Sequence, residues 1–140
     1  RTNHNFHETF DENPHRFLNV MLWGSYFRPH RHAAPPKHES FLVLQGEVGF
    51  LEFGETGEAR KAIRLRSGGI SPGAVHPLGI DLKPGVWHSL VVLSEVAVCY
   101  EVKPGPYRPA DDKELAPWAP AEGDVCARDY MSQLMRLFDE

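Results

Sequence analysis

Short apolar runs separated by glycine and proline dominate the chain up to about residue 120, and helical periodicity is scarce there. Apolar runs of this length bounded by turn residues are typical of β-strands. The clearest runs cover residues 16–23, 39–46, 86–93 and 96–102. Residues 47–53 and 59–66 flank a glycine-containing turn, which predicts a β-hairpin. Only Ser94 and Glu95 separate the last two runs, so we expect a second tight hairpin there.

The last part of the chain has a different pattern. Residues 104–123 are rich in proline and have no clear period, so we expect an extended wrap over the body of the protein. Beyond them, apolar side chains recur at i, i+4, i+7 and i+8, the spacing of one helical face: Tyr130, Leu134, Leu137 and Phe138. We therefore divide the chain into a domain over 1–123, with an N-terminal arm and the wrap, and a helix over 124–140. Asp124 is the expected N-cap, and the helix would cover the sandwich, pack on a second subunit or dock a further segment.

Composition favours one globular domain of the all-β class. Several short strands with regular turn signals predict a sandwich or barrel, and 140 residues suffice for a core without disulfides or a structural metal. A net charge of −4 argues against a general nucleic-acid binder. No apolar run approaches the roughly 20 residues of a membrane helix. Cys99 and Cys126 fit two separate thiols in a reducing compartment, which favours the cytoplasm, and a disulfide is the alternative.

Residues 24–46 contain three of the eight histidines, and a glycine closes each end of this segment. Side chains alternate between the two faces of a strand, so His30 and His32 point the same way. Arg28 and Tyr26 share that face. The alternative is a polar loop that is rich in histidine without binding a metal.

Glu39 begins the next apolar run and has Phe41 and Val43 on its own face. A turn through the intervening residues can bring Glu39 opposite the histidine pair, while His38 points to the other face. His88 follows a Pro-Gly turn and opens another apolar run, so it is the best-placed fourth ligand. Three imidazoles and one carboxylate suit a divalent transition metal such as iron, zinc, manganese or nickel.

The segment GSYFRPHRHAAPPKHESFLVLQG resembles the first motif of the cupins: Gly, five residues, His-x-His, a spacer, Glu, six residues, Gly. The matching positions are Gly24, His30, His32, Glu39 and Gly46. The spacer before the glutamate is longer than usual. LKPGVWHSLVV resembles the second motif, although Pro84 and Gly85 are adjacent and Val92 stands where the motif has asparagine.

A closer resemblance covers nearly the whole chain. RTNHNFH, RPHRH, YEVKPGPY and DKELAPWAPAEGD are similar to segments of the WbuC-type cupin fold metalloproteins, a family associated with bacterial surface-polysaccharide gene clusters. The resemblance implies a cupin double-stranded β-helix, a jelly-roll sandwich or barrel, with one metal ion held by the four residues above. Cupins often pair through their sheets, so it also favours a homodimer.

Arg28, Tyr26 and Glu101 are candidate substrate-binding residues. An arginine on an inward strand face is costly unless it is paired, and beside a metal it could bind a carboxylate or phosphate in bidentate fashion. The alternative is a structural ion pair between Arg28 and Glu101. Tyr26 would line the same pocket or fill the core, and Cys99, on the same face as Glu101, fits a buried inert thiol.

Other aromatic and imidazole side chains have weaker signals. Three histidines fall in the N-terminal arm, where we expect them to be solvated unless the arm folds over the mouth of a pocket: His4, His7 and His15. His76 fits a loop. An aromatic platform for a sugar is one interpretation of Trp87, Trp118 and Tyr107. Ordinary packing explains these three residues equally well.

Three functional hypotheses follow. The first is a small metal-dependent enzyme, an isomerase or lyase, acting on a carbohydrate or another oxygen-rich anionic metabolite. The second is a non-haem iron dioxygenase that uses the same site. The third, from another class, is a non-catalytic metal- or ligand-binding module that regulates or scaffolds a pathway. A small anionic ligand is the expected partner, with neither nucleic acid nor membrane.

Overall fold

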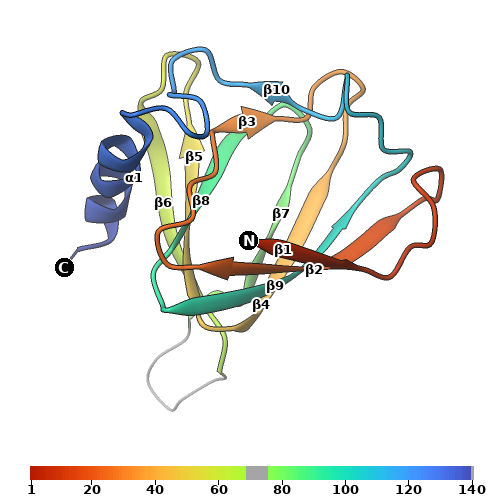
Figure 1. Ribbon diagram of the computed structural model, residues 1–140, viewed down its shortest axis with the longest axis horizontal. Coiled ribbons are helices and arrows are strands. Elements are labelled where there is room, and N and C mark those ends of the chain that lie inside the picture. Colours follow the sequence, from red (N-terminus) through yellow and green to blue (C-terminus); the bar gives the residue numbers. More distant parts are fainter. Residues whose placement is uncertain (69–75, 140) are drawn as a thin grey trace.

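The computed structural model describes residues 1–68 and 76–139, which form two antiparallel five-stranded sheets packed face to face, with a helix against one of them (Figure 1). The first sheet has the order β1 (Thr2–Asn5), β2 (His15–Leu22), β9 (Val96–Lys103), β4 (Glu39–Gln45) and β7 (Gly79–Leu82). The second has the order β10 (Glu114–Leu115), β3 (His30–Arg31), β8 (Trp87–Val92), β5 (Glu47–Phe53) and β6 (Ala59–Arg66). The prediction of an all-β jelly roll with a C-terminal helix is confirmed.

Of the two predicted hairpins, one is correct and one is wrong. Strands β5 and β6 pair directly from Glu47–Arg66 to Phe53–Ala59, as expected. Strands β8 and β9 do not pair: β8 lies between β3 and β5 in the second sheet, and β9 lies between β2 and β4 in the first. The short connection through Ser94 and Glu95 therefore crosses between sheets, because each of these apolar strands is a central strand of its own sheet.

Gly46 makes the equivalent crossing from β4 to β5. Its φ of +77° is favourable only for glycine. A Cβ at this position would also lie 2.1 Å from the carbonyl oxygen of Val96, at the start of β9. The two crossings thus pack against each other, and the glycine that closes the histidine-rich segment is needed for backbone geometry.

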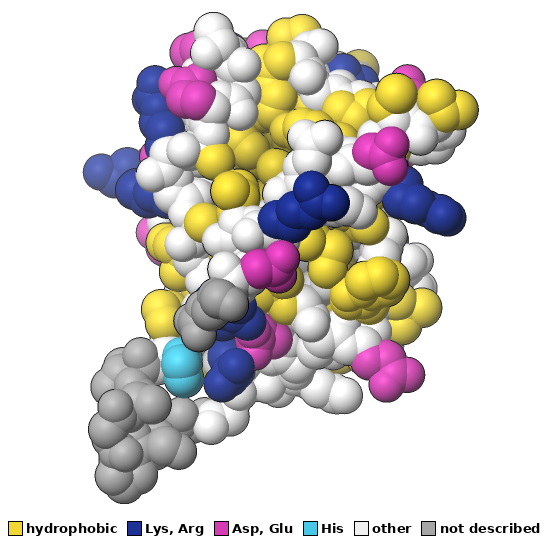
Figure 2. Space-filling view, turned by 90° about the vertical axis from the view of Figure 1, so that its left-hand side faces the viewer, with side chains coloured by type: hydrophobic (Ala, Val, Ile, Leu, Met, Phe, Trp, Pro, Cys, Tyr) yellow, Lys and Arg dark blue, Asp and Glu magenta, His cyan; other side chains and the backbone are white. Residues whose placement is uncertain are grey.

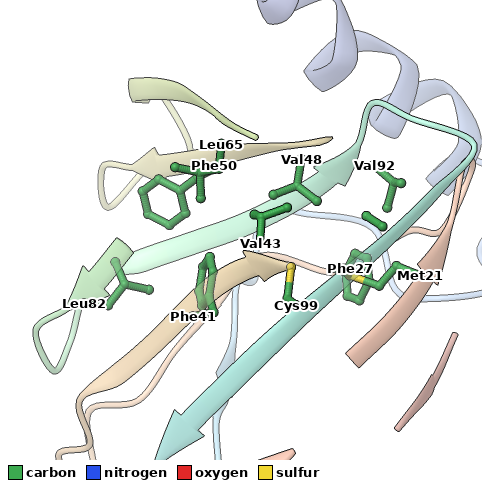
Figure 3. Close-up of a cluster of buried hydrophobic side chains, with 11 residues drawn as sticks. Met21, Phe27, Phe41, Val43, Val48, Phe50, Leu65, Leu82, Val92 and Cys99 are labelled. Carbon is green, nitrogen blue, oxygen red and sulfur yellow. The ribbon is translucent and has the colours of Figure 1, made fainter. Parts of the chain in front are cut away.

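The main core lies between the sheets (Figure 3). Its side chains come from inward positions of strands in both sheets and, at Phe27, from the segment before β3: Met21, Phe27, Phe41, Val43, Val48, Phe50, Leu65, Leu82, Val92, Ala97 and Cys99. Cys99 and Cys126 are both free thiols, as expected, and Cys99 is buried. The burial of Phe41 and Val43 fixes the phase of β4, so Glu39, two residues before Phe41, also points inward.

The C-terminal helix covers the outer face of the second sheet. Helix α1 (Ala127–Met135) and a short 3₁₀ helix, η1 (Arg136–Phe138), contribute Leu134 and Phe138 to a second apolar cluster. The ring of Phe138 lies over Gly49 on β5, where a Cβ would be 2.4 Å from it. The expected N-cap was wrong. Cys126 is the N-cap of α1, and Asp124, two residues before it, accepts a hydrogen bond from the backbone amide of Cys126.

Both predicted flanking segments join the sheets. The N-terminal arm forms edge strand β1, and the proline-rich wrap forms β10, which pairs with β3. On the side of the molecule that carries α1, acidic and basic side chains are interspersed among apolar ones (Figure 2). None of the helices in the described part of the chain is long and apolar enough to cross a membrane.

Candidate metal centre

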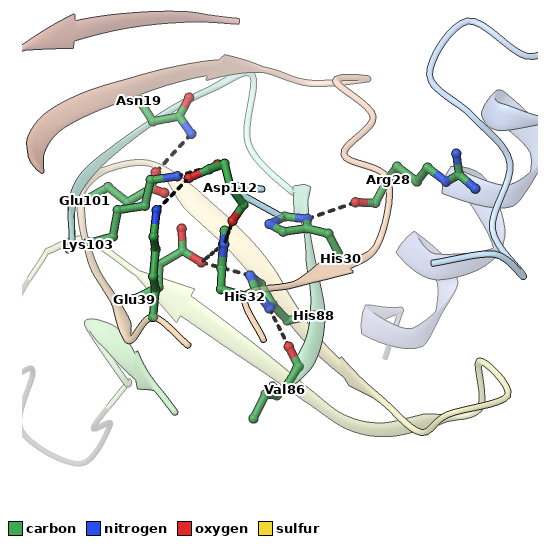
Figure 4. A network of polar contacts seen from close by, with 11 residues as sticks. Asn19, Arg28, His30, His32, Glu39, Val86, His88, Glu101, Lys103 and Asp112 are labelled. Atoms are coloured by element: carbon green, nitrogen blue, oxygen red, sulfur yellow. Dashed lines mark hydrogen bonds and ion pairs between the residues drawn. The ribbon is translucent and has the colours of Figure 1, made fainter. Parts of the chain in front are cut away.

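Four side chains meet at the inner surface of a cavity between the sheets: His30, His32, Glu39 and His88 (Figure 4). One potential ligand atom from each lies within 4.8 Å of all the others. His32, Glu39 and His88 are at most 5% exposed. The structure therefore brings together all four residues that the sequence singles out, and three imidazoles with one carboxylate form a donor set that a divalent transition metal favours.

Both sheets contribute to this cluster. His30 on β3 is paired in register with His88 on β8, which places their ring centroids 4.5 Å apart. His32 follows β3 by one residue. Glu39 opens β4 on the opposite sheet and reaches across, so that its Oε2 lies 3.0 Å from His88 Nε2 and 3.2 Å from His32 Nε2. His38, the alternative to Glu39, is exposed.

Backbone carbonyls orient all three imidazoles. The Nδ1 atom lies within hydrogen-bond distance of a carbonyl oxygen in each case: 3.0 Å to Arg28 for His30, 2.5 Å to Asp112 for His32, and 2.9 Å to Val86 for His88. A carbonyl only accepts, so Nδ1 carries the proton and donates it. The Nε2 lone pair of each neutral ring is then free to bind a metal, the arrangement that outer hydrogen bonds usually give ligand histidines.

This arrangement leaves electron pairs facing one another. The Nε2 lone pairs of His32 and His88 point at a carboxylate oxygen, and among the described residues the buried Nε2 of His32 has no hydrogen-bond partner. Buried acceptors that face each other are unfavourable unless a proton or a cation lies between them. The orphaned nitrogen and the donor set thus fit a metal ion.

Electrostatics distinguish the two carboxyl groups of the cavity. Burial would raise the pKa of Glu39, but the hydrogen bond that it accepts from Glu101 holds this pKa well below its ordinary value. Burial, together with the neighbouring Glu39, raises the pKa of Glu101 well above its ordinary value. Glu39 is therefore the charged carboxylate and Glu101 the protonated acid beside it. Burial and the neighbouring His88 lower the pKa of His30, which keeps its ring neutral.

Of the three candidate substrate-binding residues, the structure places only Glu101 at the cavity. Its carboxyl Oε2 accepts a hydrogen bond from Asn19 at 3.3 Å. Arg28 points away and donates to the carbonyl of Ala116 at 2.8 Å (Figure 4). The Tyr26 hydroxyl donates to the carbonyl of Pro120 at 2.9 Å. The expectation that both residues share the inward face of His30 and His32 was wrong, because residues before His30 leave the strand conformation and alternation does not extend back to them.

The structure does not bring the three aromatic residues of the suggested sugar platform together. Trp87 and Trp118 lie together, with ring centroids 6.2 Å apart, in the second apolar cluster. Tyr107 instead pairs with Phe10 at the cavity. His76 is exposed.

The cavity has a volume of about 410 Å³ and includes residues that the sequence analysis did not connect with the site. His7 and His15 stack at 4.0 Å, and both are buried rather than solvated. Lys103 and Lys113 also line the cavity. The sequence contained a signal for one of these residues. Lys103 follows Glu101 by two residues on β9, so the two side chains lie on the same face of the strand.

The two sheets and the site together define a cupin-type double-stranded β-helix, and comparisons with known structures support this class. A cupin-2 domain protein from Shewanella frigidimarina has 18% sequence identity and a TM-score of 0.52, over 74% of this chain and 80% of that one. Two larger proteins share the fold. NovW, a 4-keto-6-deoxy sugar epimerase from the novobiocin cluster of Streptomyces spheroides, has 19% identity and a TM-score of 0.58 over 75% of this chain. CapF, a capsular polysaccharide assembling protein of Staphylococcus aureus, has 19% identity and a TM-score of 0.58 over 81%.

This chain spans only part of those two proteins, 52% of the length of NovW and 31% of that of CapF. A family model described as "Domain of unknown function (DUF6016)" matches residues 1–65, which include His30, His32 and Glu39 but not His88. No curated protein matches the sequence. The comparisons therefore establish the fold and leave the reaction to chemical argument.

Proposed function

We propose that His30, His32, Glu39 and His88 hold one divalent transition metal ion, and that the protein is a small metal-dependent enzyme. The proposed substrate is a carbohydrate or another oxygen-rich anionic metabolite. One observation carries the proposal: the three Nε2 lone pairs and an ionised carboxylate converge at a cavity of about 410 Å³, large enough for a small molecule. A purely structural metal would not need this space.

A metal ion at this position would supply Lewis-acid polarisation of a substrate oxygen or, if it were iron, redox chemistry with dioxygen. The chain's own groups have separate tasks. Glu101 holds a proton next to Glu39, and Asn19 donates to Glu101 from the neighbouring strand. The apolar walls contributed by Phe17 and Phe27 limit the access of water.

Relatives in fold favour a carbohydrate substrate. NovW is a sugar epimerase and CapF takes part in the assembly of a capsular polysaccharide. The resemblance of several segments to the WbuC-type cupin fold metalloproteins points the same way, and we propose membership of that family on those segments. A cytoplasmic location is part of the proposal, because both cysteines are free thiols.

The test is metal content in freshly purified, untagged protein, measured by elemental analysis. We expect about one equivalent of a transition metal in the wild type and close to none in a His30→Ala/His32→Ala variant. His38→Ala is the matched control, since His38 lies beside Glu39 but is exposed. Circular dichroism would check that the double variant folds. Full metal content in the double variant would refute the proposed site.

The alternative is a non-catalytic binding module, and an activity screen would distinguish it from an enzyme. The metal-loaded protein would be incubated with sugar acids and nucleotide sugars, with the metal-free protein as control. Turnover only in the loaded sample supports the enzyme, and no turnover with any metal supports the module. The homodimer stays a prediction, which measurement of the solution mass would check.

A further inference from the structure

Positive charge exceeds negative charge along one side of the cavity. Lys37 and Lys103 share a single carboxylate, that of Asp112, at 3.4 Å and 3.1 Å. All three side chains are largely buried. One carboxylate cannot neutralise two ammonium groups, so this buried triad carries one net positive charge.

Lys113, the residue after Asp112, adds a second cation. It lines the same cavity, and in the described part of the chain no carboxylate oxygen lies within 4.0 Å of its ammonium group. The side chain of Lys113 is exposed and lines the cavity. Partial removal of its ammonium group from water, together with the positive charges of Arg1 and Lys103, lowers the pKa of Lys113. A small anion can reach this group from solution, and its binding would offset the repulsion between the neighbouring cations.

This basic side lies next to the candidate metal centre. The carbonyl oxygen of Asp112 accepts the Nδ1 hydrogen of His32, while the carboxylate of the same residue binds Lys103. A small molecule in the cavity can therefore reach the metal ligands and the two lysines at the same time. Arg28, which the sequence offered as one candidate for binding an anion, instead donates to the carbonyl of Ala116.

We propose that Lys103 and Lys113 form a subsite for the carboxylate or phosphate group of a small-molecule ligand whose other oxygens face the metal centre. That this ligand is a substrate rests on the proposed function. The subsite narrows the substrate class to molecules that carry an oxyanion separate from the oxygen that binds the metal. Ammonium groups recognise both oxyanions through charge-assisted hydrogen bonds.

The test measures binding of inorganic phosphate and of acetate to metal-free protein at about pH 7, by NMR titration, where lysine is charged. We expect the wild type to bind at least one of the two ions, and the one that binds identifies the group that the subsite takes. Lys113→Gln should weaken that binding by about tenfold, the loss of one charge-assisted hydrogen bond. Lys83→Gln is the matched control, since Lys83 is exposed and lies outside the cavity lining.

A second variant, Lys103→Gln, should also weaken binding, and Asp112 keeps Lys37 as its partner there. The inference is overturned if the wild type binds neither ion, or if Lys113→Gln binds as tightly as Lys83→Gln. Repeating the titration with His30→Ala/His32→Ala separates the two proposals. Retained anion binding in a variant that has lost its metal supports the subsite, whatever the metal analysis of the wild type shows.

Discussion

The interior of the sandwich has an apolar end and a polar end, and the same three strands build both. On β4, Glu39 is followed at inward positions by Phe41 and Val43. On β9 the order is reversed, since Ala97 and Cys99 precede Glu101. On β8 the first inward residue is His88, at the polar end, and the strand reaches the apolar end at Val92.

The difference teaches that strand alternation selects which side chains face the interior, while their chemistry changes along each strand. Packing at the apolar end fixes the backbone of β4, β8 and β9 and so determines where the polar side chains meet. The polar end contributes little stability of its own, because its buried groups lose water and have few partners. Mutations at the two ends should therefore have opposite consequences for stability and metal binding.

The largest loss of stability is expected at the apolar end. Met21 is fully buried among Phe27 and Ala97, and Met21→Ala would remove those contacts and leave a cavity. We expect the free energy of unfolding to fall by about 2–5 kcal/mol, with metal content at native levels in the protein that remains folded. Urea unfolding followed by circular dichroism measures the first, and elemental analysis the second. A loss below about 1 kcal/mol would contradict the role assigned to this end.

At the polar end, His30→Leu should change stability little and abolish metal binding. The substitution removes one hydrogen bond, to the carbonyl of Arg28, and replaces a half-buried neutral imidazole by an apolar side chain. In metal-free protein we expect a change within about 1 kcal/mol. The same urea titration, with chelator present for both proteins, provides the measurement. Strong destabilisation of the metal-free variant would show that the polar end does stabilise the fold.

Acid should destabilise the protein in part through His15, whose pKa is lowered by burial and then by the nearby His7, Lys103 and Lys37. Because the folded pKa is below the ordinary 6.5, the unfolded chain takes up the proton first as the pH falls. Stability is therefore lost as the pH decreases below about 6.5. We expect the urea midpoint to fall less in His15→Phe than in the wild type between about pH 7.5 and 5.5. Equal losses in both proteins would exclude His15 as a contributor.

Cys99 lies where the two ends meet, and the smallest effect is expected there. Burial raises the pKa of this thiol to about 12, whereas Cys126 is exposed. The native protein should therefore react with one equivalent of a thiol reagent, at Cys126, and with two after unfolding. Peptide mass spectrometry locates the label, and Cys126→Ser should show no labelling in the native state. Rapid labelling of native Cys99 would mean that this region opens readily.

Several features were predictable because they depend on local rules. The spacing of His30 and His32 places both on one side of the chain, and alternation with Phe41 turns Glu39 inward and His38 outward. The hairpin of β5 and β6 followed from its turn residues. The same rules failed where the chain leaves regular structure, as at Arg28 and Tyr26, or changes sheet, as between β8 and β9.

The sequence by itself determined the strand-rich fold, the inward phase of the main strands and the identity of the four clustered residues, because strand periodicity and motif spacing are properties of neighbouring positions. Only the tertiary structure decided that His15, Lys103 and Lys113 face the same cavity as this cluster. It also decided that the backbone carbonyl of Asp112 accepts a hydrogen bond from His32 while its carboxylate binds Lys37 and Lys103. These contacts join residues up to 80 positions apart in the chain, and their geometry is set by how two sheets pack, which no local pattern encodes.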